Sequence, residues 1–132
     1  DLFDEDTGSY KYTITGEENE GWDNVLIGAM KDKDMDSMLK LFKELLPNVQ
    51  TFFVTKVNNP RTFEPDVLYN KIKFVYNRDD FSEDKVFEDA ISATEEAWKY
   101  TQATDSSLVI LGSLYLAGEI RGTIRELINA GR

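Results

Sequence analysis

The segment SLVILGSLYLAGEI, residues 107–120, contains the pattern that decides the fold. Its first five residues are mainly apolar, which is typical of a strand buried on both faces of a parallel sheet. Gly112 and Ser113 follow, and from Leu114 to Asn129 apolar residues recur at helical spacing. Gly112 permits a tight turn and Ser113 can cap a helix, so the segment predicts a strand that runs directly into a helix.

Three further strand-and-helix units are predicted upstream of this segment. The expected strands are 24–29, 51–55 and 73–76, and the expected helices are 34–46, a short one that opens at 64–69 and a long one capped by Ser82. Four alternations of apolar strand and helix predict an α/β fold, with a mostly parallel sheet and helices on both of its faces. In such sheets, ligands bind outside the carboxyl ends of the strands.

The length of 132 residues fits one compact domain. Charge is distributed unevenly along it, and acidic residues are concentrated near the N-terminus. Residues 1–23 contain eight Asp or Glu and a single lysine. We expect an acidic N-terminal segment there, in which residues 10–15 form an edge strand or no regular structure. Residues 24–132 form the predicted α/β domain.

The composition excludes several classes of function. The chain has neither cysteine nor histidine, so disulfides, His-ligated zinc and Ser-His-Asp catalysis are excluded. Its formal net charge of −10 would repel a nucleic-acid backbone. No apolar stretch is long enough to span a bilayer, and the acidic N-terminus is unlike a signal peptide. We therefore expect a cytoplasmic protein that binds neither nucleic acid nor membrane.

The loop Asp32-Lys33-Asp34-Met35-Asp36 resembles the opening of a calcium loop. A calcium loop that starts at Asp32 would need glycine at its sixth position and glutamate at its twelfth, where this chain has Ser37 and Lys43. We therefore interpret the loop as an exposed connection with a helix cap. The functional hypothesis is that Lys33 faces an anionic ligand at the helix N-terminus.

Two further residues follow predicted strands. Arg61, in the turn after strand 51–55, is either solvated or a bidentate partner for a carboxylate or phosphate. Ser113 is first of all a helix cap, a role compatible with a hydrogen bond to a ligand carboxylate. The chain has no Gly-x-x-x-x-Gly-Lys-Ser/Thr and no Gly-x-Gly-x-x-Gly motif, so it cannot build an ATP or dinucleotide site from the usual loops.

Three segments in this order resemble a known family. Residues 25–34 (VLIGAMKDKD), 59–61 (NPR) and 111–121 (LGSLYLAGEIR) are similar to the C-terminal domain of bifunctional folylpolyglutamate synthase/dihydrofolate synthase, a member of the Mur ligase superfamily. The resemblance covers residues 24–128. It implies a Rossmann-like three-layer sandwich.

The resemblance also implies a function. The family joins glutamate to a folate through an acyl phosphate, made with ATP and Mg²⁺ on a central P-loop domain. By resemblance, Lys33 and Ser113 contact glutamate and Arg61 contributes to substrate binding. The family motif Asp-Gly-Ala-His-Asn-Pro and the P-loop are absent from this chain. We therefore predict that the chain has no catalytic or metal-ligating residues, binds no cofactor alone and is inactive in isolation.

Two functions follow from these observations. The first is a substrate-binding domain that positions glutamate against an acyl phosphate formed on another domain, with glutamate, folate and the P-loop domain as partners. The alternative is a stand-alone, non-catalytic α/β protein-interaction module derived from that domain.

Overall fold

The computed structural model describes residues 2–4, 9–13, 23–32, 34–78 and 84–130. Strands and helices alternate through most of this part of the chain. In order they are β1 (Leu2–Asp4), β2 (Ser9–Thr13), β3 (Asp23–Gly28), α1 (Met35–Leu45), β4 (Val49–Val54), α2 (Pro65–Tyr76), β5 (Lys85–Val86), α3 (Ala90–Thr104), β6 (Ser107–Gly112) and α4 (Leu114–Ala130).

The six strands form one sheet in the order β1-β2-β6-β3-β4-β5. Strands β6, β3, β4 and β5 are parallel, and the β1–β2 hairpin continues the sheet in antiparallel fashion beyond β6. The chain steps outward from β3 to β4 and β5, then returns to the other side of β3 with β6. The β3–β6 boundary is thus a topological switch point, where sheets of this kind open a crevice for ligands.

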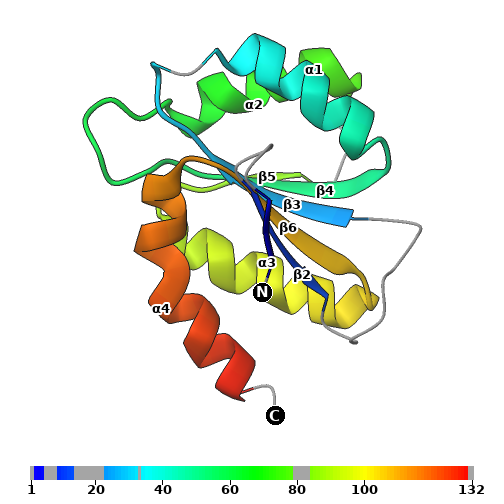
Figure 1. Cartoon of the computed structure of the whole chain (residues 1–132), viewed down its shortest axis with the longest axis vertical. Coiled ribbons are helices and arrows are strands. Elements are labelled where there is room, and N and C mark those ends of the chain that lie inside the picture. Colours follow the sequence, from blue (N-terminus) through cyan, green and yellow to red (C-terminus); the bar gives the residue numbers. More distant parts are fainter. Residues whose placement is uncertain (1, 5–8, 14–22, 33, 79–83, 131–132) are drawn as a thin grey trace.

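Helices cover both faces of the sheet (Figure 1), with α1 and α2 on one face and α3 and α4 on the other. Alternate side chains of each central strand enter the two cores: Val25 and Ile27 pack with α1 and α2, and Leu26 packs with α3 and α4. The expected three-layer α/β sandwich with a mostly parallel sheet is confirmed. No helix in the described ranges is long and apolar enough to cross a bilayer.

The third strand is not where the sequence predicted it. Residues 73–76 form the last turn of α2, because Leu68 and Ile72 make a helical apolar stripe that packs on the sheet and Val75 and Tyr76 extend it. Phe74 is 85% exposed, so the apolar run is not buried as a strand would be. The third parallel strand is β5, whose two residues are both exposed and too few to form an apolar run that a sequence pattern reveals.

The long helix also starts later than predicted. It begins at Ala90, and the carboxylate of Asp89 caps it by accepting hydrogen bonds from the N–H groups of Ile91 and Ser92. The predicted cap, Ser82, lies outside the described residues. Strand β5 intervenes because Val54 and Val86 pair across the sheet edge, and this pairing overrides the local helical pattern.

The N-terminal segment contributes two strands. The predicted strand at 10–15 corresponds to β2, which pairs with β6. Residues 14 and 15 lie outside the described residues. Strand β2 is not the edge of the sheet, because β1 pairs along its other side. Strand β1 has three residues and was not predicted.

Candidate functional site

The carboxyl ends of β3 and β6 approach each other closely, and both strands end in glycine. Gly28 and Gly112 are register partners. Gly112 has a φ of +115°, and a Cβ there would collide with the carbonyl oxygen of Gly28. The N–H of Ser113 donates to that same oxygen at 3.1 Å. This contact fixes the start of α4 directly above the end of β3, at the switch point.

Ser113 occupies the position predicted for a helix cap, and its capping role is confirmed. Its Oγ accepts a hydrogen bond from the N–H of Tyr115 at 3.0 Å, and its carbonyl accepts from Leu116 and Ala117. The residue is only 6% exposed. Among the described residues, the structure shows no hydrogen bond that the Ser113 hydroxyl donates.

Arg61 lies in a loop that is bound to the segment after β3. The N–H of Lys31 donates to the carbonyl of Arg61 at 2.7 Å, and the N–H of Phe63 donates to Ala29 at 2.9 Å. The Arg61 guanidinium lies 3.4 Å from a carboxylate oxygen of Asp32, and both side chains are more than half exposed. The structure therefore brings Arg61 to the loop that contains Lys33 in the sequence.

Lys33 itself lies outside the described residues, whereas its acidic neighbours are described. Asp34 caps α1, where hydrogen bonds from Ser37 hold the pKa of its carboxyl below the ordinary value of 3.8. Asp36 pairs with Lys71 at 3.1 Å, and Asp32 pairs with Arg61. Each carboxylate of the calcium-like sequence thus has a partner within the protein. The described part of the chain contains no group of three or more acidic side chains placed to hold a metal ion.

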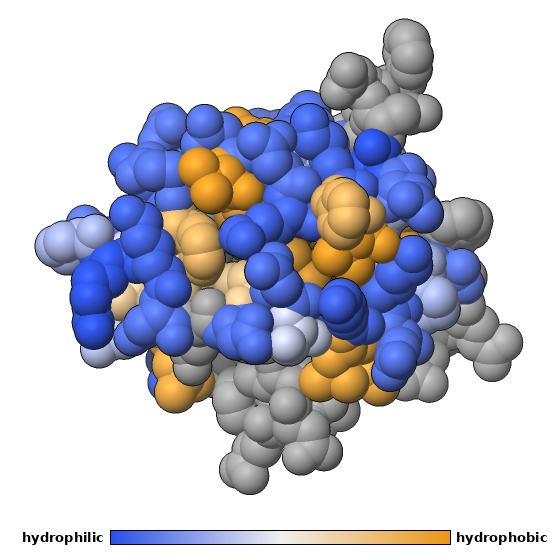
Figure 2. All heavy atoms as spheres, turned by 90° about the horizontal axis from the view of Figure 1, so that it is seen from above, coloured by the Kyte–Doolittle hydropathy of each residue, from blue (hydrophilic) through white to orange (hydrophobic). Residues whose placement is uncertain are grey.

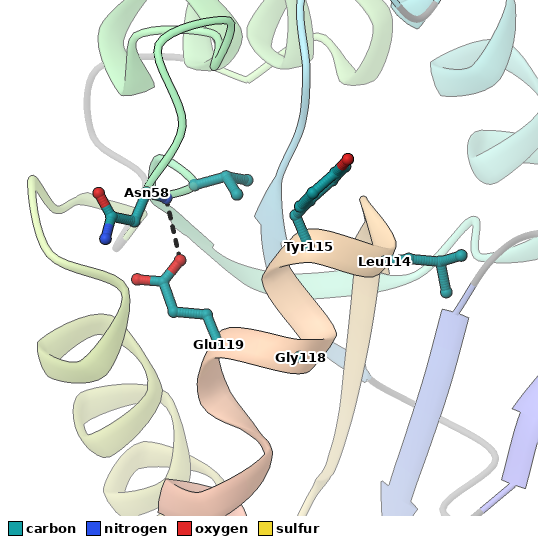
Figure 3. A pocket seen from close by; sticks show the side chains of 6 residues that line it. Asn58, Leu114, Tyr115, Gly118 and Glu119 are labelled. Atoms are coloured by element: carbon teal, nitrogen blue, oxygen red, sulfur yellow. Dashed lines mark hydrogen bonds between the residues drawn. The ribbon is translucent and has the colours of Figure 1, made fainter.

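A groove of about 600 Å³ lies beside the start of α4 and was not predicted from the sequence. It lies between the first two turns of α4 and the loop after β4, and its lining residues are Val57, Asn58, Leu114, Tyr115, Gly118 and Glu119 (Figure 3). A signal was present in the sequence: Leu114 and Tyr115 are apolar or aromatic but lie off the buried stripe of Leu116, Ile120 and Ile124. They are 69% and 58% exposed.

The opposite helix layer has a mainly hydrophilic surface. Figure 2 looks onto the face formed by α1 and α2, where apolar side chains form separate spots in a mainly hydrophilic surface. The exposed large apolar residues of these two helices are Leu41, Leu45, Val67 and Phe74. Scattered apolar residues of this kind are normal on soluble proteins.

Comparison with known proteins gives matches at the level of three-dimensional structure. No protein-family model and no curated protein sequence matches the chain. A structure of FolC from E. coli in complex with DHPP and ADP superposes with a TM-score of 0.59 at 17% identity, over 85% of this chain and 24% of that one. Folylpolyglutamate synthase from Mycobacterium tuberculosis complexed with ADP gives 0.57 at 17% identity, over 88% and 25%. A structure of that enzyme with ADP and AMPPCP gives 0.57 at 16% identity.

These matches establish a shared fold. The chain spans about a quarter of the length of the enzymes that it matches. At 16–17% identity the likeness concerns the fold and does not extend to individual site residues. The chain therefore has the fold of a domain-sized part of folylpolyglutamate synthase, and the resemblance of its sequence to the C-terminal domain of that enzyme family is confirmed as a likeness of fold.

Proposed function

We propose that this chain is the substrate-binding domain of an ATP-dependent ligase that adds glutamate to a folate. The observation that carries the proposal is the structural likeness to ADP-bound folylpolyglutamate synthases over 85–88% of the chain. The domain's task is positioning: it brings the glutamate amine to an acyl phosphate held by another domain. Fixing two reactants in this way converts a bimolecular step into a nearly unimolecular one.

Three residues carry this proposed role. Ser113 donates its hydroxyl proton to a glutamate carboxylate while its oxygen continues to cap α4. Lys33 and Arg61 offset the ligand's negative charge. The ion pair of Arg61 with Asp32 is solvent-exposed and 3.4 Å long, so exchanging Asp32 for a ligand carboxylate costs little.

Other parts of the reaction belong, in this proposal, to a P-loop domain outside these 132 residues. ATP and Mg²⁺ bind there, because this chain has no P-loop motif. The folate substrate lies between the two domains, and the complete enzyme works in the cytoplasm. The isolated chain is accordingly expected to show no ATP-dependent ligation.

A second candidate is a non-catalytic interaction module that has kept the fold. The observation that favours it is the absence of histidine and of the motif Asp-Gly-Ala-His-Asn-Pro, which opens the corresponding domain of the family. A module of this kind would bind a protein partner and would not respond to glutamate.

Amide NMR spectra recorded during titration with L-glutamate, with D-glutamate as the control, separate the two candidates. We expect L-selective shifts at Ser113 and Arg61. Ser113→Asp keeps an acceptor for the cap but removes the hydroxyl donor and adds a negative charge, so it should abolish the response. Ser113→Thr keeps the hydroxyl and should preserve it. An identical response to both enantiomers, or an unchanged response in Ser113→Asp, would contradict the glutamate site.

A further inference from the structure

The groove between α4 and the loop after β4 has a fixed geometry. The backbone N–H of Asn58 donates to Oε1 of Glu119 at 3.0 Å, which ties the loop to the second turn of α4. Figure 3 shows Glu119 extended toward Asn58, with Tyr115 one turn earlier on the same helix. Residues four positions apart on a helix are neighbours on its surface. The groove therefore places an aromatic ring and a carboxylate within reach of one bound group.

The groove contains a negative charge that no nearby cation neutralises. Among the described residues that line it, Glu119 is the only charged one, and its Oε2 has no described hydrogen-bond partner. Lys56 at the start of the loop is paired with Glu88 at 3.1 Å. Arg121 is two residues from Glu119 on the helix and so faces another side. Because the whole chain has a formal charge of −10, the groove favours a cationic occupant.

Apolar surface extends the groove toward the first turn of α4. Leu114 is 69% exposed and Tyr115 is 58% exposed. A Cβ at Gly118 would meet no heavy atom within 4 Å, so the helix surface between these side chains and Glu119 is open. The volume of about 600 Å³ accommodates more than one side chain of a partner. Exposed apolar and aromatic side chains around a groove are typical of a protein-interaction site.

Arginine is the cationic side chain that matches both the carboxylate and the ring. Its guanidinium is planar and stacks on an aromatic face while its N–H groups donate to a carboxylate. A lysine ammonium can pair with Glu119 but has no flat surface to lay on Tyr115. Arginine and tyrosine are also among the residues that contribute most to the affinity of protein interfaces.

We propose that this groove docks a segment of a partner protein that presents an arginine beside an apolar side chain. The guanidinium donates to Oε2 of Glu119 and stacks on Tyr115 above Gly118, and the apolar neighbour covers Leu114. This site goes beyond the proposed glutamate site and does not depend on it. It uses different residues, and it selects a cation where the glutamate site selects an anion.

The test is an amide NMR titration of the full chain with short blocked peptides. The probe is acetyl-Leu-Arg-Leu-amide, with leucine on both sides because the proposal does not fix the direction of the segment. In the control peptide, citrulline replaces arginine with an uncharged group of nearly the same shape. We expect the arginine peptide to shift Asn58, Tyr115 and Gly118, and the citrulline peptide to bind about tenfold more weakly. Absence of shifts with the arginine peptide, or equal binding of the two peptides, would overturn the proposal.

Two other occupants of the groove are tested in the same way. Acetyl-arginine-amide lacks the apolar neighbours and should bind more weakly than the peptide. Equal binding would indicate a site for small cations and would overturn the docking of a protein segment. A dilution series of the chain alone should leave the groove amides unshifted. Concentration-dependent shifts there would show that a second copy of the chain occupies the groove, and would likewise overturn the proposal.

Variants decide whether the peptide occupies the groove. Glu119→Gln keeps an acceptor for Asn58 but removes the charge, so the arginine peptide should bind about tenfold more weakly. Glu126→Gln removes a charge at an exposed position of α4 outside the groove and should bind as the wild type does. Gly118→Leu fills the groove and should abolish the shifts, whereas Gly122→Leu, equally open but outside the groove, should preserve them.

Equal binding by the two glutamate variants, or by the two glycine variants, would overturn the proposal. The L-glutamate response of Glu119→Gln, measured in parallel, reports separately on the proposed function.

Discussion

At the scale of single residues, the carboxylate of Asp84 is the most consequential buried charge described. Its side chain is fully buried and accepts hydrogen bonds from the Phe52 N–H and the Tyr69 hydroxyl, both at 2.8 Å. The Nε of Arg78 lies 3.3 Å away, and the same guanidinium donates to two carbonyls of β4. Asp84 thus supplies the partner that the short strand β5 cannot give to Phe52.

Replacing Arg78 should remove the positive charge that lies beside the buried Asp84 carboxylate. We expect Arg78→Met to lower the free energy of unfolding by about 3–5 kcal/mol, measured by urea denaturation. The double variant Arg78→Met/Asp84→Asn should recover part of this loss, because it removes both charges. A loss below about 1 kcal/mol in the single variant would show that the pair is not a structural requirement.

Two glycines of the same segment should respond in opposite directions to alanine. Gly112 has a positive φ and faces the Gly28 carbonyl, so Gly112→Ala should lower the free energy of unfolding by about 1–3 kcal/mol or more. Gly122 is exposed and helical with open space around it, so Gly122→Ala should raise it by up to about 1 kcal/mol. Thermal denaturation measures both. A stable Gly112→Ala would contradict the close approach of β3 and β6.

At the scale of elements, the helix caps make stability depend on pH. Hydrogen bonds from Ser37 lower the pKa of Asp34, and hydrogen bonds from Ser92 lower the pKa of Asp89, relative to 3.8. Because the folded pKa values are lower, these caps stabilise the folded state above pH 3.8. The contribution is lost as the pH falls through the folded values. NMR of the carboxyl carbons should place the titration midpoints of both side chains below pH 3.8. The free energy of unfolding of the variant Asp34→Asn/Asp89→Asn should depend less on pH below 3.8 than that of the wild type.

The elements also show why sequence alone located some strands and missed others. Strands β3, β4 and β6 are buried on both faces, and each is a mainly apolar run that a sequence pattern reveals. Strand β5 is two exposed residues at a sheet edge, and its position is set by pairing with β4. The apolar residues at 73–76 serve the end of a helix instead. Local pattern predicts buried elements well, and edge elements depend on tertiary pairing.

At the scale of the whole molecule, the switch point between β3 and β6 explains how much of the site could be predicted. Strand-to-helix junctions in a parallel sheet all lie at one edge of the sheet. Ser113 and Arg61 could therefore be assigned to that edge from the order of strands and helices along the sequence. The groove could not be predicted, because it depends on the distance between α4 and the loop after β4. Its residues, Asn58 and Glu119, are 61 positions apart in the chain.

In the proposed function, glutamate binds at the carboxyl edge of the sheet, at the switch point between β3 and β6. The most direct measurement is a crystal structure of the 132-residue chain grown with L-glutamate. We expect density for the amino acid at the N-terminus of α4, with one carboxylate within hydrogen-bond distance of the Ser113 Oγ and the other facing the loop of Arg61. An empty edge at saturating glutamate, or glutamate bound elsewhere on the molecule, would contradict the claim.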